Sequence, residues 1–233
     1  MEKALYIETP AFDVCEQMAA DELLCSSPPA GFLLRFYEWA DDGITYGYSQ
    51  KIKEVRAAAA LMNRSGLEYT RRPTGGGLVL HEKDLTFSFI FPSPELDFAP
   101  AAAYDRLHTA ISGAYKEHGI KYDLLKEKTA DYKVNGPLMT CFKKPVCMDM
   151  LEDGRKILGG ALRKFGGRML YQGSLQTDSA RRDAEFNKKI ITGALEKEYC
   201  VKFTAVRFTS SALKKTMRIA ESKYRTLAWK ERI

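Results

Sequence analysis

The run from Arg71 to Gly77 holds the densest set of groups in this chain that could bind a ligand. It reads Arg71-Arg72-Pro73-Thr74-Gly75-Gly76-Gly77, which combines two guanidinium groups, a hydroxyl and three backbone N–H groups without side chains. Such groups can converge on an anionic or carbonyl-bearing ligand. The run matches neither the phosphate loop GxxxxGK(S/T) nor the dinucleotide loop GxGxxG. A plain hairpin corner is the alternative interpretation, because adjacent glycines also suit a sharp turn.

Thiols and imidazoles are the other groups that could do chemistry here. The five cysteines, an odd number, form neither a disulfide ladder nor a CxxC pair, so most of them are expected to be buried thiols. The three histidines are too few and too dispersed for a histidine metal site, and His81-Glu82 lacks the second histidine of a zinc-protease helix. We therefore expect no metal site.

Hydrophobic periodicity predicts the elements that must position these groups. Pro28-Pro29 ends the first expected helix, and Gly166-Gly167 joins the last two expected strands. The expected helices are 14–24, 51–61, 104–118 and most of the chain from Ala180 onward. The expected strands are 32–37, 44–48, 67–72, 78–81, 85–91, 154–165 and 168–176.

Strands and helices alternate irregularly, and hairpins are mixed with longer helical connections. This order favours an α+β fold with a mixed sheet over a regular parallel α/β fold. The 233 residues contain no repeat or credible linker, so we expect one domain over residues 1–233. Residues 203–233 are expected to form a basic, mostly helical C-terminal segment.

Charge is unevenly distributed along the chain. Residues 202–233 carry nine basic and two acidic side chains, whereas the remainder is nearly neutral. Such a segment could favour an acidic partner, or it could be the solvated face of a helix. No zinc finger, aromatic-basic RNA signature or basic zipper region occurs, so no nucleic-acid partner is expected. No run is long and apolar enough to cross a bilayer, and Met1-Glu2-Lys3-Ala4 opens no leader, so we expect a soluble, cytoplasmic protein.

A longer motif around the glycines carries a family resemblance. The segment from Arg71 through Leu78-Val79-Leu80-His81-Glu82-Lys83-Asp84-Leu85-Thr86-Phe87-Ser88 resembles the signature of the lipoate-protein ligase and octanoyltransferase family. Supporting segments occur at 18–22, 34–39, 47–50, 154–161 and 223–229. The resemblance covers nearly the whole chain and implies the fold of biotin and lipoate protein ligases, with a catalytic core similar to class II aminoacyl-tRNA synthetases. It also implies largely antiparallel sheets flanked by helices.

Two chemistries occur in that family, and a suitably placed cysteine separates them. Ligases activate a free acid with ATP and magnesium, whereas cysteine-type transferases take octanoyl from acyl carrier protein through a thioester. Cys141-Phe142, 15 residues before Lys156, resembles the transferase element. A thiolate can hold the acyl group without ATP, and the Lys156 ammonium could favour that thiolate, stabilise an oxyanion or assist proton movement. Cys147 is the rival nucleophile.

The resemblance therefore implies a protein octanoyltransferase of lipoate biosynthesis that needs no cofactor. Its expected partners are octanoyl-acyl carrier protein and the lipoyl domains of 2-oxoacid dehydrogenases, or the glycine-cleavage H protein. An ATP-dependent lipoate or octanoate ligase and a non-catalytic lipoyl-domain binding module are the alternatives. Cys141 and Lys156 are the expected catalytic residues. The expected substrate-binding residues are Arg71, Arg72, Thr74, Gly75, Gly76, Gly77, His81, Gly159 and Ala161.

Overall fold

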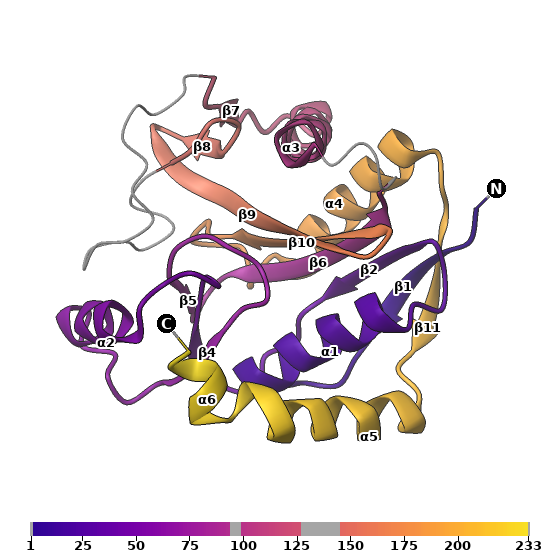
Figure 1. Cartoon of the computed structure of the whole chain (residues 1–233). Coiled ribbons are helices and arrows are strands. Elements are labelled where there is room, and N and C mark those ends of the chain that lie inside the picture. Colours follow the sequence, from indigo (N-terminus) through magenta and orange to yellow (C-terminus); the bar gives the residue numbers. More distant parts are fainter. Residues whose placement is uncertain (1, 94–98, 127–144, 233) are drawn as a thin grey trace.

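The computed structural model describes residues 2–93, 99–126 and 145–232 (Figure 1). Eight strands form its main sheet, in the order β11-β1-β2-β6-β10-β9-β8-β7. The neighbouring pairs β11-β1 and β1-β2 are parallel, and the other five pairs are antiparallel. The strands are β1 (Ala4–Glu8), β2 (Phe32–Phe36), β6 (Leu85–Pro92), β7 (Asp123–Leu124), β8 (Met150–Glu152), β9 (Arg155–Phe165), β10 (Arg168–Leu175) and β11 (Phe203–Arg207). The predicted mixed, largely antiparallel α+β fold is confirmed.

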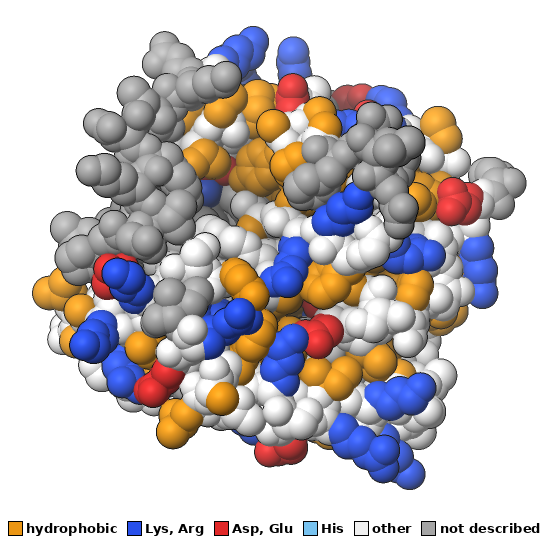
Figure 2. Space-filling view, viewed as in Figure 1, with side chains coloured by type: hydrophobic (Ala, Val, Ile, Leu, Met, Phe, Trp, Pro, Cys, Tyr) orange, Lys and Arg blue, Asp and Glu red, His pale blue; other side chains and the backbone are white. Residues whose placement is uncertain are grey.

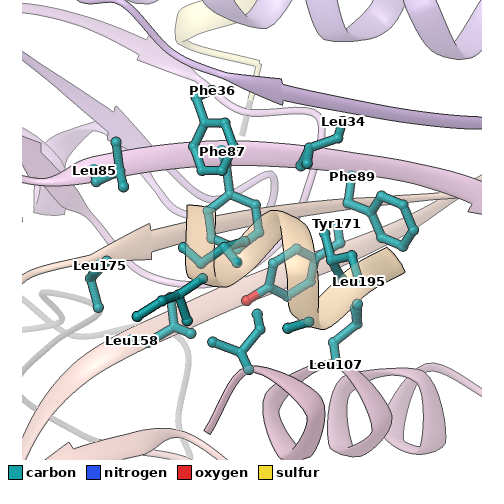
Figure 3. Close-up of a cluster of buried hydrophobic side chains, with 14 of the residues drawn as sticks. Leu34, Phe36, Leu85, Phe87, Phe89, Leu107, Leu158, Tyr171, Leu175 and Leu195 are labelled. Atoms are coloured by element: carbon teal, nitrogen blue, oxygen red, sulfur yellow. The ribbon is translucent and has the colours of Figure 1, made fainter. Parts of the chain in front are cut away.

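Helices cover both faces of this sheet because its central strands are apolar on both sides. On β6, Phe87 and Phe89 pack toward α3 (Pro100–Glu117) and α4 (Ala184–Tyr199), in the buried cluster of Figure 3. Ile90 belongs to a separate cluster with Leu24 of α1 (Val14–Ser26) on the opposite face. This alternation follows from the two-residue period of a strand.

A second, three-stranded sheet presents the glycine run. Its order is β4-β3-β5, formed by Glu68–Arg71, Gly43–Tyr46 and Val79–His81. The helix α2 (Ile52–Leu61) packs Ile52 and Val55 against Ile44 and Leu78 of this unit. Residues 72–78 therefore connect two strands that both border β3.

The C-terminal residues pack closely against the N-terminal part of the chain. The helix α5 (Ser210–Ile219) and the π-helical turn η1 (Ala220–Tyr224) contact α1, and α6 (Leu227–Lys230) contacts β4 (Figure 1). The segment is mostly helical, as expected, but it begins with a strand that the periodicity did not indicate. Residues 203–207 alternate only weakly in polarity, and they become strand β11 by pairing with β1 at the sheet edge.

Candidate active site

The glycine run forms a loop, and hydrogen bonds from the Arg72 side chain hold it in place. The Arg72 guanidinium donates to the carbonyl oxygens of Gly75 and Gly77, at 2.9 and 2.8 Å, and to Oγ1 of Thr45 at 2.9 Å. Gly76 has a φ of 88°, which favours glycine. A Cβ on Gly47 would lie 1.8 Å from the Gly76 carbonyl oxygen, so the two backbones can touch only because residue 47 is also glycine.

The Arg71 side chain forms its hydrogen bonds with backbone carbonyl groups and does not point into open space. Its guanidinium donates to the carbonyl oxygens of Tyr48 and Gln50, and to those of Trp229 and Lys230. The Arg71 side chain is fully buried. These bonds join the glycine loop to the C-terminal turn, so the contacts described for Arg71 are positioning contacts.

Thr74 connects the loop to a polar network beneath it. Its hydroxyl donates to Oε1 of Gln172 at 2.6 Å, and Nε2 of Gln172 donates to Oδ2 of Asp21 at 2.7 Å. Asp21 also forms a buried salt bridge with Arg35 at 2.6 Å. Buried polar groups of this kind fix side-chain positions when every member has a partner. The network therefore fixes the position of the loop relative to β10, the strand that carries Gln172.

His81 is held by contacts on both ring nitrogens. Nδ1 lies 2.8 Å from Asp84 Oδ2, Nε2 lies 2.7 Å from Thr45 Oγ1, and the ring stacks on Trp39 at 4.3 Å. Burial raises the pKa of Asp84, but His81 and the hydroxyls of Thr86 and Ser174 outweigh that effect and hold the pKa below its ordinary value.

A narrow cavity of about 30 Å³ lies between the two sheets. Four of the predicted substrate-binding residues line it: Arg72, His81, Gly159 and Ala161. The register of β9 and β10 explains this, since Gly159 pairs with Ser174 and Ala161 pairs with Gln172, and all four positions border the cavity. The structure thus gathers around one space four predicted residues that are up to 89 positions apart in the sequence, from Arg72 to Ala161.

Lys156 reaches Gly159, which is one of the residues that line this cavity. A Cβ on Gly159 would lie 2.4 Å from Nζ of Lys156, so the glycine leaves the volume that the ammonium occupies. Nζ forms a salt bridge with Asp149 Oδ2 at 2.7 Å, and both side chains are at most 2% exposed. A buried carboxylate beside a lysine favours the ammonium form and fixes its direction.

Two residues that the sequence did not indicate complete this group. Tyr104 of α3 donates to Asp149 Oδ1 at 2.5 Å and accepts the N–H of Gly160 at 2.9 Å. His108, one turn further along α3, stacks on Tyr104 at 4.0 Å and lies 2.7 Å from the Tyr171 hydroxyl. Burial, followed by the charge of Lys156, lowers the pKa of His108 to about 3, so its imidazole is neutral at physiological pH.

The predicted nucleophile Cys141 lies outside the described residues. Among the described cysteines, Cys15 and Cys25 are buried, and burial raises the pKa of both thiols, that of Cys15 to about 12. These two thiols are therefore poor nucleophiles. Cys147 is partly exposed, and its Sγ lies 3.7 Å from the carbonyl oxygen of Lys126.

In the described part of the chain, one group of side chains has the spacing of metal ligands: Asp13, Cys15 and Glu68. Arg225 forms ion pairs with Asp13 and Glu68, at 2.6 and 3.3 Å, so a cation already neutralises this group. The group lies on α1 and β4, and none of its members lines the cavity.

No described helix is both long and apolar enough to span a bilayer.

Comparisons with known proteins agree with this architecture. A family profile described as lipoyl protein ligase A/B catalytic domain matches residues 13–228. An octanoyltransferase LipM of Halalkalibacterium halodurans is 30% identical over 187 residues, which are 76% of this chain and 67% of that protein. The fold matches protein Ta0514 of T. acidophilum with bound lipoic acid, with a TM-score of 0.76, 21% identity and full coverage of both chains. It also matches a lipoate-protein ligase A bound with ATP, with a TM-score of 0.76, 21% identity and 99% coverage of both chains.

The two-sheet fold matches that of solved lipoate-protein ligases, so the chain has the fold of a catalytic domain of this ligase class. The profile match spans almost the entire chain. The protein belongs to the lipoyl protein ligase A/B catalytic domain family.

Proposed function

We propose that this protein is an octanoyltransferase of lipoate biosynthesis, which moves octanoyl from acyl carrier protein to a lysine of a lipoyl domain or an H protein. Lys156 is the observation that carries the proposal, because its ammonium is held by Asp149 beside Gly159, a residue that lines the same cavity as Arg72. The curated relatives named octanoyltransferase LipM support the same reaction.

The proposed reaction has two transfer steps. The thiolate of Cys141 attacks the carbonyl carbon of the octanoyl thioester, and the carrier's pantetheine sulfur leaves and takes up a proton. The amine of the target lysine then attacks the acyl-enzyme, the Cys141 sulfur leaves, and the amine loses a proton as the amide forms. Lys156 stabilises the oxyanion of each tetrahedral intermediate. No ATP is consumed, because the energy of one thioester is kept in the next.

The site contributes binding energy as well as charge. Each buried CH₂ group of the acyl chain contributes about 0.8 kcal/mol, so an octanoyl chain can supply several kcal/mol toward chain-length selection. The cavity described above is much smaller than such a chain. We therefore propose that the acyl group enters by displacing side chains along the glycine loop.

The proposal includes a cytoplasmic location, since a catalytic thiol needs a reducing compartment.

The proposal also includes partner proteins whose surfaces are acidic. Among the described residues, Lys202, Arg207, Lys223, Arg225 and Lys230 each pair with a carboxylate. Lys214, Lys215 and Arg218 on α5 have no such partner there, and Figure 2 shows Lys and Arg side chains at this edge of the molecule. These three cations remain available to steer an acidic protein.

An ATP-dependent ligase is the second candidate, because the same fold occurs in a lipoate-protein ligase A bound with ATP. Intact-protein mass measurement after incubation with octanoyl-acyl carrier protein separates the two. A transferase gains one octanoyl group without ATP, and the adduct disappears in Cys141→Ala but persists in Cys147→Ala. No adduct, with acyl transfer only after free octanoate, ATP and magnesium are added, would establish the ligase instead. Binding of a lipoyl domain with neither activity would establish a binding module.

A further inference from the structure

Two guanidinium groups lie over one tyrosine ring at the edge of the glycine loop. The Cζ atoms of Arg163 and Arg232 are 4.5 and 4.4 Å from the ring centroid of Tyr48. Arg163 belongs to β9, Arg232 follows α6, and Tyr48 follows β3. Tyr48 is fixed to the loop, because its N–H donates to the carbonyl oxygen of Thr74 at 2.8 Å. Three distant parts of the chain therefore place two positive charges at the loop edge.

Neither arginine is neutralised by a carboxylate among the described residues. Arg163 donates one N–H to the carbonyl oxygen of Pro73 at 2.6 Å, and Arg232 makes only ring contacts there, to Tyr48 and Trp229. Arg225, by contrast, pairs with four carboxylates. Both guanidinium groups flank the same tyrosine ring, and two like charges around one ring attract an anion. The fixed fork of a guanidinium suits phosphate oxygens in particular.

The position of this pair relative to Lys156 indicates which anion it would bind. Residues 159, 161 and 163 lie on one face of β9 because side-chain directions repeat every two residues. Gly159 touches the Lys156 ammonium, whereas Arg163 lies four residues further along, about 13 Å away at 3.3 Å per residue. Arg163 donates to the carbonyl oxygen of Pro73, next to the glycine run, and Gly75 has open space at its Cβ position. Gly159 and Ala161, which line the cavity, thus lead along β9 from Lys156 toward Arg163.

We propose that Arg163 and Arg232 form a subsite for a phosphate ester on the group that delivers the acyl chain. The inference rests on the proposed function, in which the carrier's thiol arm bears a phosphate at the end opposite its sulfur. With the thioester carbonyl at Lys156, an extended arm along the loop places that phosphate near Arg163. A nucleotide is the other ligand that could supply a phosphate group to this subsite.

Small-molecule donors test the subsite without a carrier protein surface. Wild type should transfer octanoyl from octanoyl-4′-phosphopantetheine with a KM about tenfold lower than from octanoyl-pantetheine. Arg232→Gln and Arg163→Gln should each reduce this ratio to about threefold or less, with little change in the KM for the unphosphorylated donor. The matched control Arg182→Gln, at an exposed arginine before α4, should keep the wild-type ratio. A ratio unchanged in both variants would overturn the subsite.

Arg232→Gln is the cleaner variant, because it removes no hydrogen bond among the described residues, whereas Arg163→Gln also removes the bond to Pro73. Calorimetric titration with 4′-phosphopantetheine, and separately with ATP, tests the site without any turnover. Weaker binding of 4′-phosphopantetheine to Arg232→Gln supports the carrier arm, and weaker binding of ATP alone supports a nucleotide as the phosphate source. Equal binding of both probes to wild type and variant would refute the subsite, even if acyl transfer itself is observed.

Discussion

Nζ of Lys156 lies 2.7 Å from Oδ2 of Asp149, and both side chains are buried. Oδ2 also accepts the N–H of Val146 at 2.6 Å, and Oδ1 accepts the Tyr104 hydroxyl. The carboxylate therefore keeps two hydrogen bonds besides its ion pair. In the proposed reaction this arrangement would hold a cation near the tetrahedral oxyanion, in surroundings that need not reorganise.

We expect Lys156 and Asp149 to depend on each other for the stability of the fold. The loss of activity on replacing Lys156 should not depend on Asp149. Lys156→Met leaves a buried carboxylate without its counter-ion and should lower the free energy of unfolding by about 3 kcal/mol, as breaking a buried pair does. Lys156→Met/Asp149→Asn should recover part of that loss while transfer stays abolished. Urea unfolding and an acyl-transfer assay on the three variants measure both quantities. Additive losses in the double variant would show that the two side chains act independently.

Tyr104 should act as a positioning residue for Lys156. Tyr104→Phe removes the hydroxyl that bridges Asp149 and Gly160, and it should lower kcat about tenfold with little change in KM. Tyr115→Phe is the matched control on the same helix, since it loses one buried hydrogen bond, to Asn187. That bond does not involve Lys156 or Asp149. Each variant should lose about 1 kcal/mol of stability. Equal activity of the two variants would remove the role of Tyr104.

The glycine loop should tolerate a side chain at one position and not at the next. Gly75→Val adds its methyl groups to open space, so we expect a folded protein with impaired octanoyl binding and a KM raised at least tenfold. Gly76→Val should in addition be less stable by about 1–3 kcal/mol, because φ is 88° at that residue. Gly66→Val, in an exposed loop with equally open space, is the control. Normal transfer by Gly75→Val would contradict an acyl path along the loop.

His108 should make the protein less stable in mild acid. Its pKa is lowered to about 3 in the fold and returns to about 6.5 on unfolding, so the unfolded chain binds the extra proton between these values. Stability should therefore fall as the pH drops through this window, by about 2 kcal/mol between pH 7 and pH 5. His108→Gln should remove that slope, whereas His118→Gln, at the exposed end of the same helix, should retain it. Urea midpoints at the two pH values measure the difference.

The three cations of α5 should affect the rate of encounter with protein partners. Lys214→Ser/Lys215→Ser/Arg218→Ser should lower kcat/KM for octanoyl-acyl carrier protein several-fold at low salt, and the loss should shrink near 0.5 M salt. Transfer from octanoyl-pantetheine should not change, because that donor carries no charge. A loss that is independent of salt would indicate a structural effect of the substitutions.

The sequence was sufficient for the family, the fold class and most elements. The apolar run in 85–91 and the helical spacing in 14–24 predicted β6 and α1, because both patterns arise from local geometry. The motif from Arg71 to Ser88 carried the resemblance that the profile match confirmed. Lys156 stood out through its Gly-Arg-Lys-Ile-Leu-Gly context.

Only the tertiary structure decided which polar groups meet. Arg71 and Arg72 are adjacent in sequence and equally basic, yet Arg71, the last residue of β4, binds the C-terminal turn, whereas Arg72, just after the strand, binds the glycine loop. Tyr104 and Arg163 carry no local signal. Tyr104 meets Asp149 through helix packing, and Arg163 and Arg232, 69 residues apart, both contact the Tyr48 ring, so their roles depend on long-range packing that periodicity cannot encode.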